Sequence, residues 1–89
     1  NLMAFTAARK YDRGEHCGAE ANAAKYLAGE ACFKACSNAI QTHGGMGYAK
    51  EFHVERYFRE MLIHRIAPVS PQMILNYLSE RVLGLPRSY

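Results

Sequence analysis

The sequence lacks tryptophan and has only three prolines and three cysteines in its 89 residues. Its longest apolar runs fall well short of the roughly 20 residues that a membrane-spanning helix requires. The first residues also lack the basic and then apolar layout of a secretion signal. An odd number of cysteines without a disulfide-dense pattern is typical of a reducing compartment. These absences predict a soluble chain with free thiols and no membrane span.

The chain also has little excess of positive over negative charge, because its formal net charge is only +3. Basic residues alternate with acidic ones, as in Glu55-Arg56 and Arg59-Glu60, and no basic stripe forms. This pattern argues against nucleic-acid binding. The 49% hydrophobic content is that of an ordinary globular chain, and the length allows one domain at most, over residues 1–89. A domain this small is stable alone only if its core is compact or is completed by a partner.

A metal site is an alternative that the cysteines raise. Cys32 and Cys36 lie one helical turn apart, and His16 or His43 are further candidate ligands. The paired short ligand spacings of structural zinc sites are missing, however. We therefore predict small buried thiols and no metal site.

Helix-period patterning dominates the chain, and no segment alternates convincingly with a period of two. The sequence therefore predicts an all-α fold, an antiparallel helical bundle in which the longest pair of helices packs antiparallel. The breaks between or after helices are marked by glycines and prolines, namely Gly14, the glycines after residue 43, the prolines at 68 and 71, and Gly84. The four expected helices span about residues 2–13, 18–42, 52–64 and 71–83.

Apolar stripes on these helices predict which side chains face a core. The stripes are Leu2, Met3, Phe5 and Ala8, then Val54, Tyr57, Phe58, Met61 and Leu62, and finally Ile74, Tyr77, Leu78 and Val82. The longest helix also has a face of small residues, formed by Ala24, Ala28, Ala31, Ala35 and Ala39. Small side chains allow a neighbouring backbone to come close, and this helix is apolar around much of its circumference. We therefore expect exposed apolar surface and association with itself or with the rest of a larger protein.

Three glycines, Gly44, Gly45 and Gly47, follow the longest helix, although ending a helix requires only one. Each permits a positive φ and close approach of the main chain to another group. Bare backbone N–H groups can bind anions, and so can the start of the helix that Ser70 caps and Pro71 opens. Glycine-rich turns between helices are also common without any ligand. The glycines alone leave both interpretations open.

The stretch Gln41-Thr42-His43-Gly44-Gly45-Met46-Gly47-Tyr48 is followed by Glu51, Val54-Glu55-Arg56 and Arg59-Glu60. This series resembles the C-terminal region of the FAD-dependent acyl-CoA dehydrogenases, which has a Q-x-x-G-G-x-G-[YF] loop and then a V-E-[RK]-x-x-R-[DE] helix. Ala23-Ala24-Lys25, at its spacing before the loop, also fits. The chain begins at Asn1 without an initiator methionine. We therefore expect a piece of a longer protein, roughly its last quarter.

The resemblance implies a four-helix C-terminal domain of a flavoenzyme that oxidises an acyl-CoA thioester to the 2,3-enoyl-CoA. It implies a homo-oligomer that shares FAD across a subunit interface, an electron-acceptor flavoprotein as a further partner, and a bacterial cytoplasmic or mitochondrial matrix location. By the same resemblance, two groups of residues contact FAD. Gln41, Thr42, His43, Gly44 and Gly45 would lie at its pyrophosphate and adenosine end, and Ser70 and Gln72 near the flavin.

One departure from the family concerns the catalytic base. Pro68 stands where many members have a glutamate that removes the α-proton, and proline cannot act as a base. Some members take this base from an earlier helix, and Glu55 and Glu60 match residues with a structural role. We therefore assign no catalytic residue to this chain. The alternative function is a non-catalytic helical interaction module in which the glycine-rich segment is only a turn.

Overall fold

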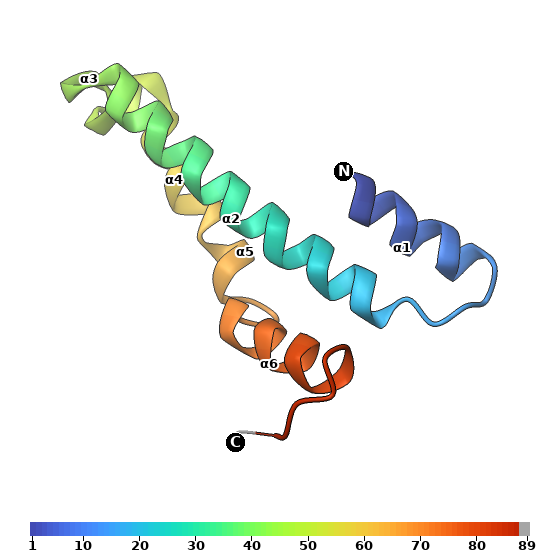
Figure 1. Ribbon diagram of the computed structural model, residues 1–89. Helices are drawn as coiled ribbons and strands as arrows, with labels where there is room; N and C mark the ends of the chain where they lie inside the picture. Colours follow the sequence, from blue (N-terminus) through green and yellow to red (C-terminus); the bar gives the residue numbers. More distant parts are fainter. Residues whose placement is uncertain (88–89) are drawn as a thin grey trace. The chain divides into compact units, whose positions relative to one another are not determined.

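The computed structural model describes residues 1–87, and none of these residues lies in a β-strand. The predicted all-α class is confirmed (Figure 1). Helix α2 is the longest element and runs through both of the compact units into which the chain divides. The first unit contains residues 1–27 and 69–87, and the second contains residues 28–68. The elements are α1 (Leu2–Asp12), α2 (Gly18–His43), α3 (Gly45–Tyr48), η1 (Lys50–Phe52), α4 (Val54–Met61), α5 (Ile63–Ile66) and α6 (Pro71–Arg81).

Helices α1, α2 and α6 end within two residues of the predicted limits. The predicted single helix over 52–64 is wrong, because η1, α4 and α5 replace it. His53 takes a left-handed conformation with φ 62°, which turns the chain immediately before α4. Leu62 lies between α4 and α5 and keeps helical angles, and its carbonyl accepts from both the Arg65 N–H at 3.0 Å and the Ile66 N–H at 3.2 Å.

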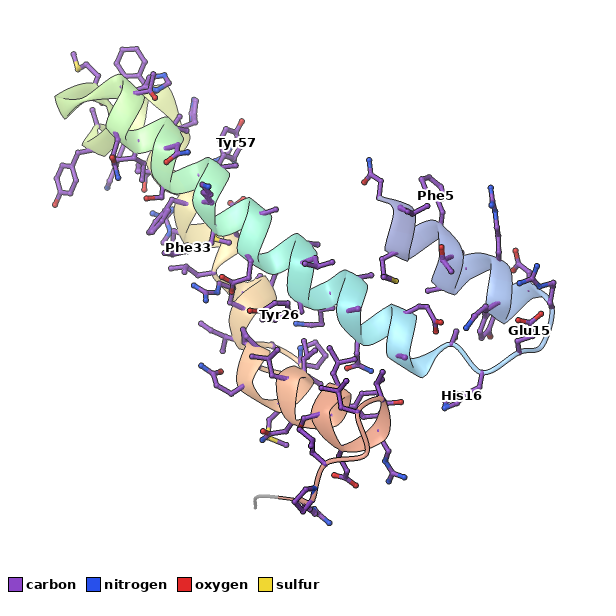
Figure 2. The ribbon with its side chains drawn as sticks, viewed as in Figure 1. Phe5, Glu15, His16, Tyr26, Phe33 and Tyr57 are labelled. Carbon is purple, nitrogen blue, oxygen red and sulfur yellow. The ribbon has the colours of Figure 1, made fainter. Side chains whose placement is uncertain are left out.

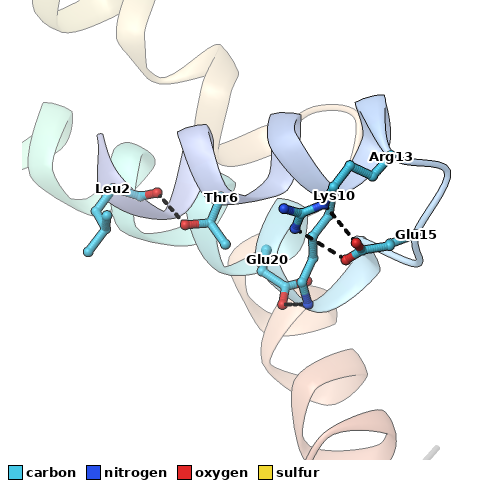
Figure 3. Close-up of polar contacts among 6 residues, drawn as sticks. All are labelled: Leu2, Thr6, Lys10, Arg13, Glu15 and Glu20. Carbon is cyan, nitrogen blue, oxygen red and sulfur yellow. Dashed lines mark hydrogen bonds and ion pairs between the residues drawn. The ribbon is translucent and has the colours of Figure 1, made fainter.

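In the first unit, α1 turns back on the start of α2. Gly14, with φ 72°, follows the end of α1 as predicted. Lys10 of α1 forms an ion pair with Glu20 of α2, and Arg13 pairs with Glu15 in the connecting loop (Figure 3). These contacts hold the two helices in an antiparallel hairpin.

Helix α6 completes the first unit. Ser70 is its N-cap and Pro71 its first residue, as the sequence predicts. Ile74 is only 1% exposed, whereas Tyr77 and Leu78 are half-buried. The prediction that Val82 is buried is wrong, because this residue lies at the open rim of a groove. The groove is lined by Met3, Ala19, Glu20, Ala23, Leu78 and Val82.

In the second unit, the later half of α2 packs antiparallel to α4 and α5. The ring centroids of Phe33 and Phe58 are 5.7 Å apart, and Arg65 bonds Glu30 at 2.7 Å. Residue numbers thus rise along α2 while they fall along α4 and α5, so this packing is antiparallel, as in the predicted bundle.

Val54 and Met61 of α4 are buried and Phe58 is half-buried, so the predicted stripe is partly right. Tyr57 is 52% exposed, contrary to the prediction (Figure 2). It lies toward the edge of the stripe that Val54, Phe58 and Met61 form at i, i+4 and i+7. There its ring lies under the Arg56 guanidinium, 5.1 Å from the ring centroid.

The core of the described chain is thin. Among residues 1–87, the buried hydrophobic side chains are Val54, Met61 and Ile74, and of these only Ile74 is fully buried. Leu2 is 81% exposed, so the prediction that it faces a core is wrong. The same holds for Phe5, which is 63% exposed (Figure 2). The small-residue face of α2 is also open at Ala28, Ala31 and Ala35. No helix within residues 1–87 is long and apolar enough to cross a membrane.

Candidate functional site

The candidate site begins where α2 ends. Residues 41–46 are all exposed, and Gly44 has φ 59°, a left-handed conformation that glycine adopts without strain. The Gly44 N–H donates to the Gln41 carbonyl at 3.1 Å, and the Gly47 N–H donates to the Gly44 carbonyl at 2.9 Å. The segment is therefore a tight turn that leads at once into α3, and not an open loop.

The three glycines have three different roles, which corrects the expectation that each serves a positive φ or a ligand's approach. Gly44 alone among them has a positive φ. A Cβ atom at Gly45 would meet nothing within 4 Å, so this position faces open space. Gly47 is buried, and a Cβ atom there would collide with the Ile40 backbone of α2. Gly47 is therefore required by packing, and only Gly44 and Gly45 leave bare backbone for a ligand.

Two of the predicted side chains bond back to α2. The Thr42 hydroxyl donates to the Asn38 carbonyl at 2.8 Å. His43 Nδ1 lies 2.8 Å from the Ala39 carbonyl, which can only accept, so Nδ1 carries the proton in this contact. The other ring nitrogen, Nε2, is then an acceptor. The Phe52 ring lies 6.1 Å from the His43 ring and gives it an aromatic neighbour.

The second group of predicted site residues lies at the start of α6. Ser70 Oγ accepts the Met73 N–H at 3.4 Å, a long capping bond, and Gln72 is exposed in the first turn. Lys25 of α2 donates from Nζ to the Val69 carbonyl at 2.9 Å, directly before the cap. Residues 41–45 belong to the second unit, and Ser70 and Gln72 to the first. The predicted site residues thus form two local groups, one in each unit.

The Arg65 side chain has a place in the structure that the sequence pattern did not indicate. Its guanidinium lies 4.6 Å from the centroid of the Phe33 ring and bonds Glu30 at 2.7 Å. Its Nε atom is buried without a hydrogen-bond partner. Arg65 also packs beside Gly29, where an added Cβ atom would lie 3.7 Å from Arg65 Cγ, an ordinary van der Waals contact. No sequence signal links residues that are so far apart, so only the fold reveals this cluster.

The acidic residues near the turn are either exposed or paired with an arginine. Glu51 and Glu60 are exposed, and Glu55 pairs with Arg59 at 2.5 Å within α4. Pro68 is exposed. These positions are consistent with structural or solvent-facing roles for the carboxylates.

The thiols are free, and within residues 1–87 no three His, Cys, Asp or Glu side chains cluster as metal ligands would. The three cysteines are half-buried. Burial, together with a hydrogen bond to Cys32, raises the pKa of the Cys36 thiol. This thiol therefore stays protonated at neutral pH.

The turn presents chemical groups of the kinds that a nucleotide contacts. The Gly44–Gly45 backbone is exposed and has open space beside it, as a group that approaches the main chain requires. Gln41 offers both donors and acceptors, and His43 Nε2 offers an acceptor, for a ribose or an adenine edge. No residue of this turn carries a negative charge that would repel a pyrophosphate.

A model of a known family matches residues 1–83, and its description is acyl-CoA dehydrogenase, C-terminal domain. The chain is 46% identical over 90 residues to the acyl-CoA dehydrogenase FadE12 of Mycobacterium tuberculosis, covering 99% of this chain and 23% of that protein. It is 40% identical over 82 residues to the caffeyl-CoA reductase-Etf complex subunit CarC of Acetobacterium woodii, covering 92% of this chain and 22% of that protein. It is 35% identical over 82 residues to an acyl-CoA dehydrogenase of Bacillus subtilis, again covering 92% and 22%.

The chain thus spans less than a quarter of the length of these relatives. No solved structure gives a significant match to it.

Proposed function

Because this chain belongs to the acyl-CoA dehydrogenase family through its C-terminal domain, we propose that it supplies the C-terminal helices and part of the FAD site of an enzyme that oxidises an acyl-CoA thioester to the 2,3-enoyl-CoA. When bound, FAD supplies the acceptor for the hydride that leaves the substrate β-carbon. The residues of this chain hold and orient the cofactor. The members of this family are oxidoreductases. What we propose for this chain is the substrate, the cofactor and the residues of the site.

The observation that carries the proposal is the turn after α2. Gly44 and Gly45 place bare, exposed main chain beside open space, directly after the polar side chains of Gln41, Thr42 and His43. The proposal assigns these five residues to the pyrophosphate and adenosine end of an FAD that is bound mainly by a neighbouring, identical subunit. The alternative is a plain turn that contacts no ligand.

The start of α6 is assigned to the flavin end of a second FAD, that of the chain's own subunit. Ser70 supplies a hydroxyl and Gln72 an exposed amide in the first turn. Backbone N–H groups at the start of a helix also favour a negatively polarised ligand. These residues orient the flavin and transfer no proton.

The proton of the substrate α-carbon must leave to a base outside this chain. Pro68, at the position where many family members carry that base, has no ionisable group. Glu55 is already paired with Arg59. The proposal therefore names no catalytic residue among residues 1–87.

The proposed partners are identical subunits, an acyl-CoA substrate and a flavoprotein that accepts the electrons. The name of the relative CarC places that protein in a complex with Etf, which supports a protein partner in electron transfer. The proposed location is the bacterial cytoplasm or the mitochondrial matrix.

Replacing Gly45 with valine in the full-length protein tests the proposal. The branched side chain would fill the open space beside the turn, so we expect FAD to be lost during gel filtration while the helix content, measured by circular dichroism, stays close to that of the parent. Gly45→Ala is the matched control, because its smaller side chain should release less FAD. Full retention of FAD by Gly45→Val would make the segment only a turn and would favour the helical interaction module.

A further inference from the structure

A lysine on α2 holds the segment that leads into α6. Lys25 Nζ donates to the Val69 carbonyl at 2.9 Å, across 44 residues of sequence. Val69 directly precedes Ser70, the N-cap of α6. We propose that Lys25 is a positioning residue that fixes the first turn of α6, and with it Ser70 and Gln72, in the orientation that the flavin requires. This inference rests on the proposed function, because it takes the flavin contacts of those two residues as given.

The segment needs such a support because its own backbone offers few hydrogen-bond donors. Pro68 and Pro71 have no N–H group, so two of the four residues from 68 to 71 cannot donate to neighbouring carbonyls. Ala67 and Ser70 have extended angles, with ψ 154° and ψ 157°, so the stretch between α5 and α6 is not helical. A carbonyl bonded to a fixed ammonium removes much of the freedom that this stretch would otherwise have.

The place of the ammonium favours positioning over simple helix stabilisation. A positive charge near a helix N-terminus opposes the helix dipole, so Lys25 gains nothing from the dipole of α6. What it gains is a charge-assisted hydrogen bond to one peptide carbonyl. That bond sets the position of the main chain immediately before the cap.

A second contact fixes α6 further along. Tyr77 lies so close to Gly18 that a Cβ atom at Gly18 would collide with the Tyr77 hydroxyl. Helix α6 thus contacts the start of α2 at its middle through Tyr77, and Lys25 bonds the residue before its N-cap. Loss of the Lys25 bond should therefore free the first turn and leave the later turns in place.

The test uses the full-length protein with the variants Lys25→Met and Lys25→Arg. Methionine keeps an apolar chain of similar length but cannot donate, whereas arginine can still donate to the carbonyl. Lys34→Met is the matched control, because Lys34 is an exposed lysine on the same helix. The measurements are amide hydrogen exchange in FAD-free protein, the visible circular dichroism of bound FAD, and kcat and KM for the best substrate of an acyl-CoA length series.

We expect Lys25→Met to speed exchange of the Met73 and Ile74 amides, which bond to Ser70, by about tenfold, with little change from Tyr77 to Arg81. The flavin circular dichroism should change, and kcat should fall by about tenfold or more with KM within about twofold, because small misplacements of positioning groups act on the reaction step. Lys25→Arg should restore most of each signal. Lys34→Met should match the parent.

Separate results overturn the inference and the proposed function. If Ser70→Ala and Gln72→Ala change the flavin circular dichroism while Lys25→Met does not, the inference is wrong and the flavin site stands. If neither Ser70→Ala nor Gln72→Ala changes the flavin signal or kcat, the proposed flavin contacts are wrong, and the inference falls with them. If Lys25→Met lowers thermal stability and FAD content but leaves the spectrum of the retained FAD unchanged, Lys25 is merely structural and the inference is overturned.

Discussion

Replacing Gly47 with alanine would place a new Cβ atom against the backbone of Ile40 at the end of α2. The nearest atom would be the Ile40 carbonyl oxygen, and the Ile40 Cα and carbonyl carbon would lie at 2.9 and 3.0 Å. All three are backbone atoms of a helix, so no flexible side chain can move aside. The turn must instead shift away from α2.

The energetic cost follows from this geometry. Inserting extra atoms into a well-packed site costs typically about 1–3 kcal/mol. Because backbone atoms form the whole contact, we place Gly47→Ala in the upper half of that range, at about 2–3 kcal/mol. That free energy corresponds to a roughly 30- to 150-fold rise in the population of locally opened turn.

Gly45→Ala is the matched control, since it adds the same Cβ atom in the same short helix. Its Cβ would meet nothing within 4 Å, and Gly45 does not have a positive φ. Alanine in a helix is more stable than glycine by roughly 0.5–1 kcal/mol. We therefore expect Gly45→Ala to leave local stability unchanged or to raise it slightly.

Amide hydrogen exchange of the FAD-free full-length protein, followed by mass spectrometry over residues 44–49, measures both effects. Exchange in Gly47→Ala should be faster than in the parent by the factor given above, and exchange in Gly45→Ala should be equal or slower. Equal exchange in the two variants would refute the reasoning, because the close approach of Gly47 to Ile40 would then not limit the turn's stability.

Three further predictions concern stability and association. The hydrogen bond from Lys10 holds the pKa of Glu20 below its usual 4.5. The contribution of Glu20 to the stability of the folded state is therefore complete above pH 4.5 and is lost as the pH falls below that value. Urea denaturation against pH should show this loss in the parent, and Glu20→Gln should weaken it. Arg65→Lys should lower the free energy of unfolding, measured by urea denaturation, by about 1 kcal/mol, because lysine stacks less well on Phe33. An equal loss of unfolding free energy in the control Arg59→Lys would contradict this role. The chain prepared alone should self-associate through its exposed apolar side chains, and light scattering that showed a dilution-resistant monomer would refute this.

Local signals in the sequence determined the positions of most helix ends. Gly14 and Gly84, with φ 72° and φ 67°, follow α1 and α6 as their sequence positions predict. Ser70 and Pro71 open α6 in the predicted arrangement. Each of these signals depends on the backbone preferences of one or two residues, so it can be read without knowledge of the rest of the fold.

The candidate site was predictable only in part. The segment 41–45 and the start of α6 were identified by resemblance, and their contacts with FAD stay a prediction. The structure adds that Thr42 and His43 bond back to α2, and that Lys25 holds the carbonyl before Ser70. A side chain's partner depends on which backbone carbonyl the fold brings near it, and sequence spacing does not give that for residues 44 positions apart.

Tertiary structure alone decided the different roles of the three glycines. Gly44, Gly45 and Gly47 are equivalent in sequence, yet one adopts a left-handed φ, one faces open space and one packs against α2. Likewise, the apolar pattern predicted Leu2 as a core residue, but the described chain offers no surface that covers it. Periodicity specifies which residues share one face of a helix, and only the packing of other elements against that face decides whether it is buried.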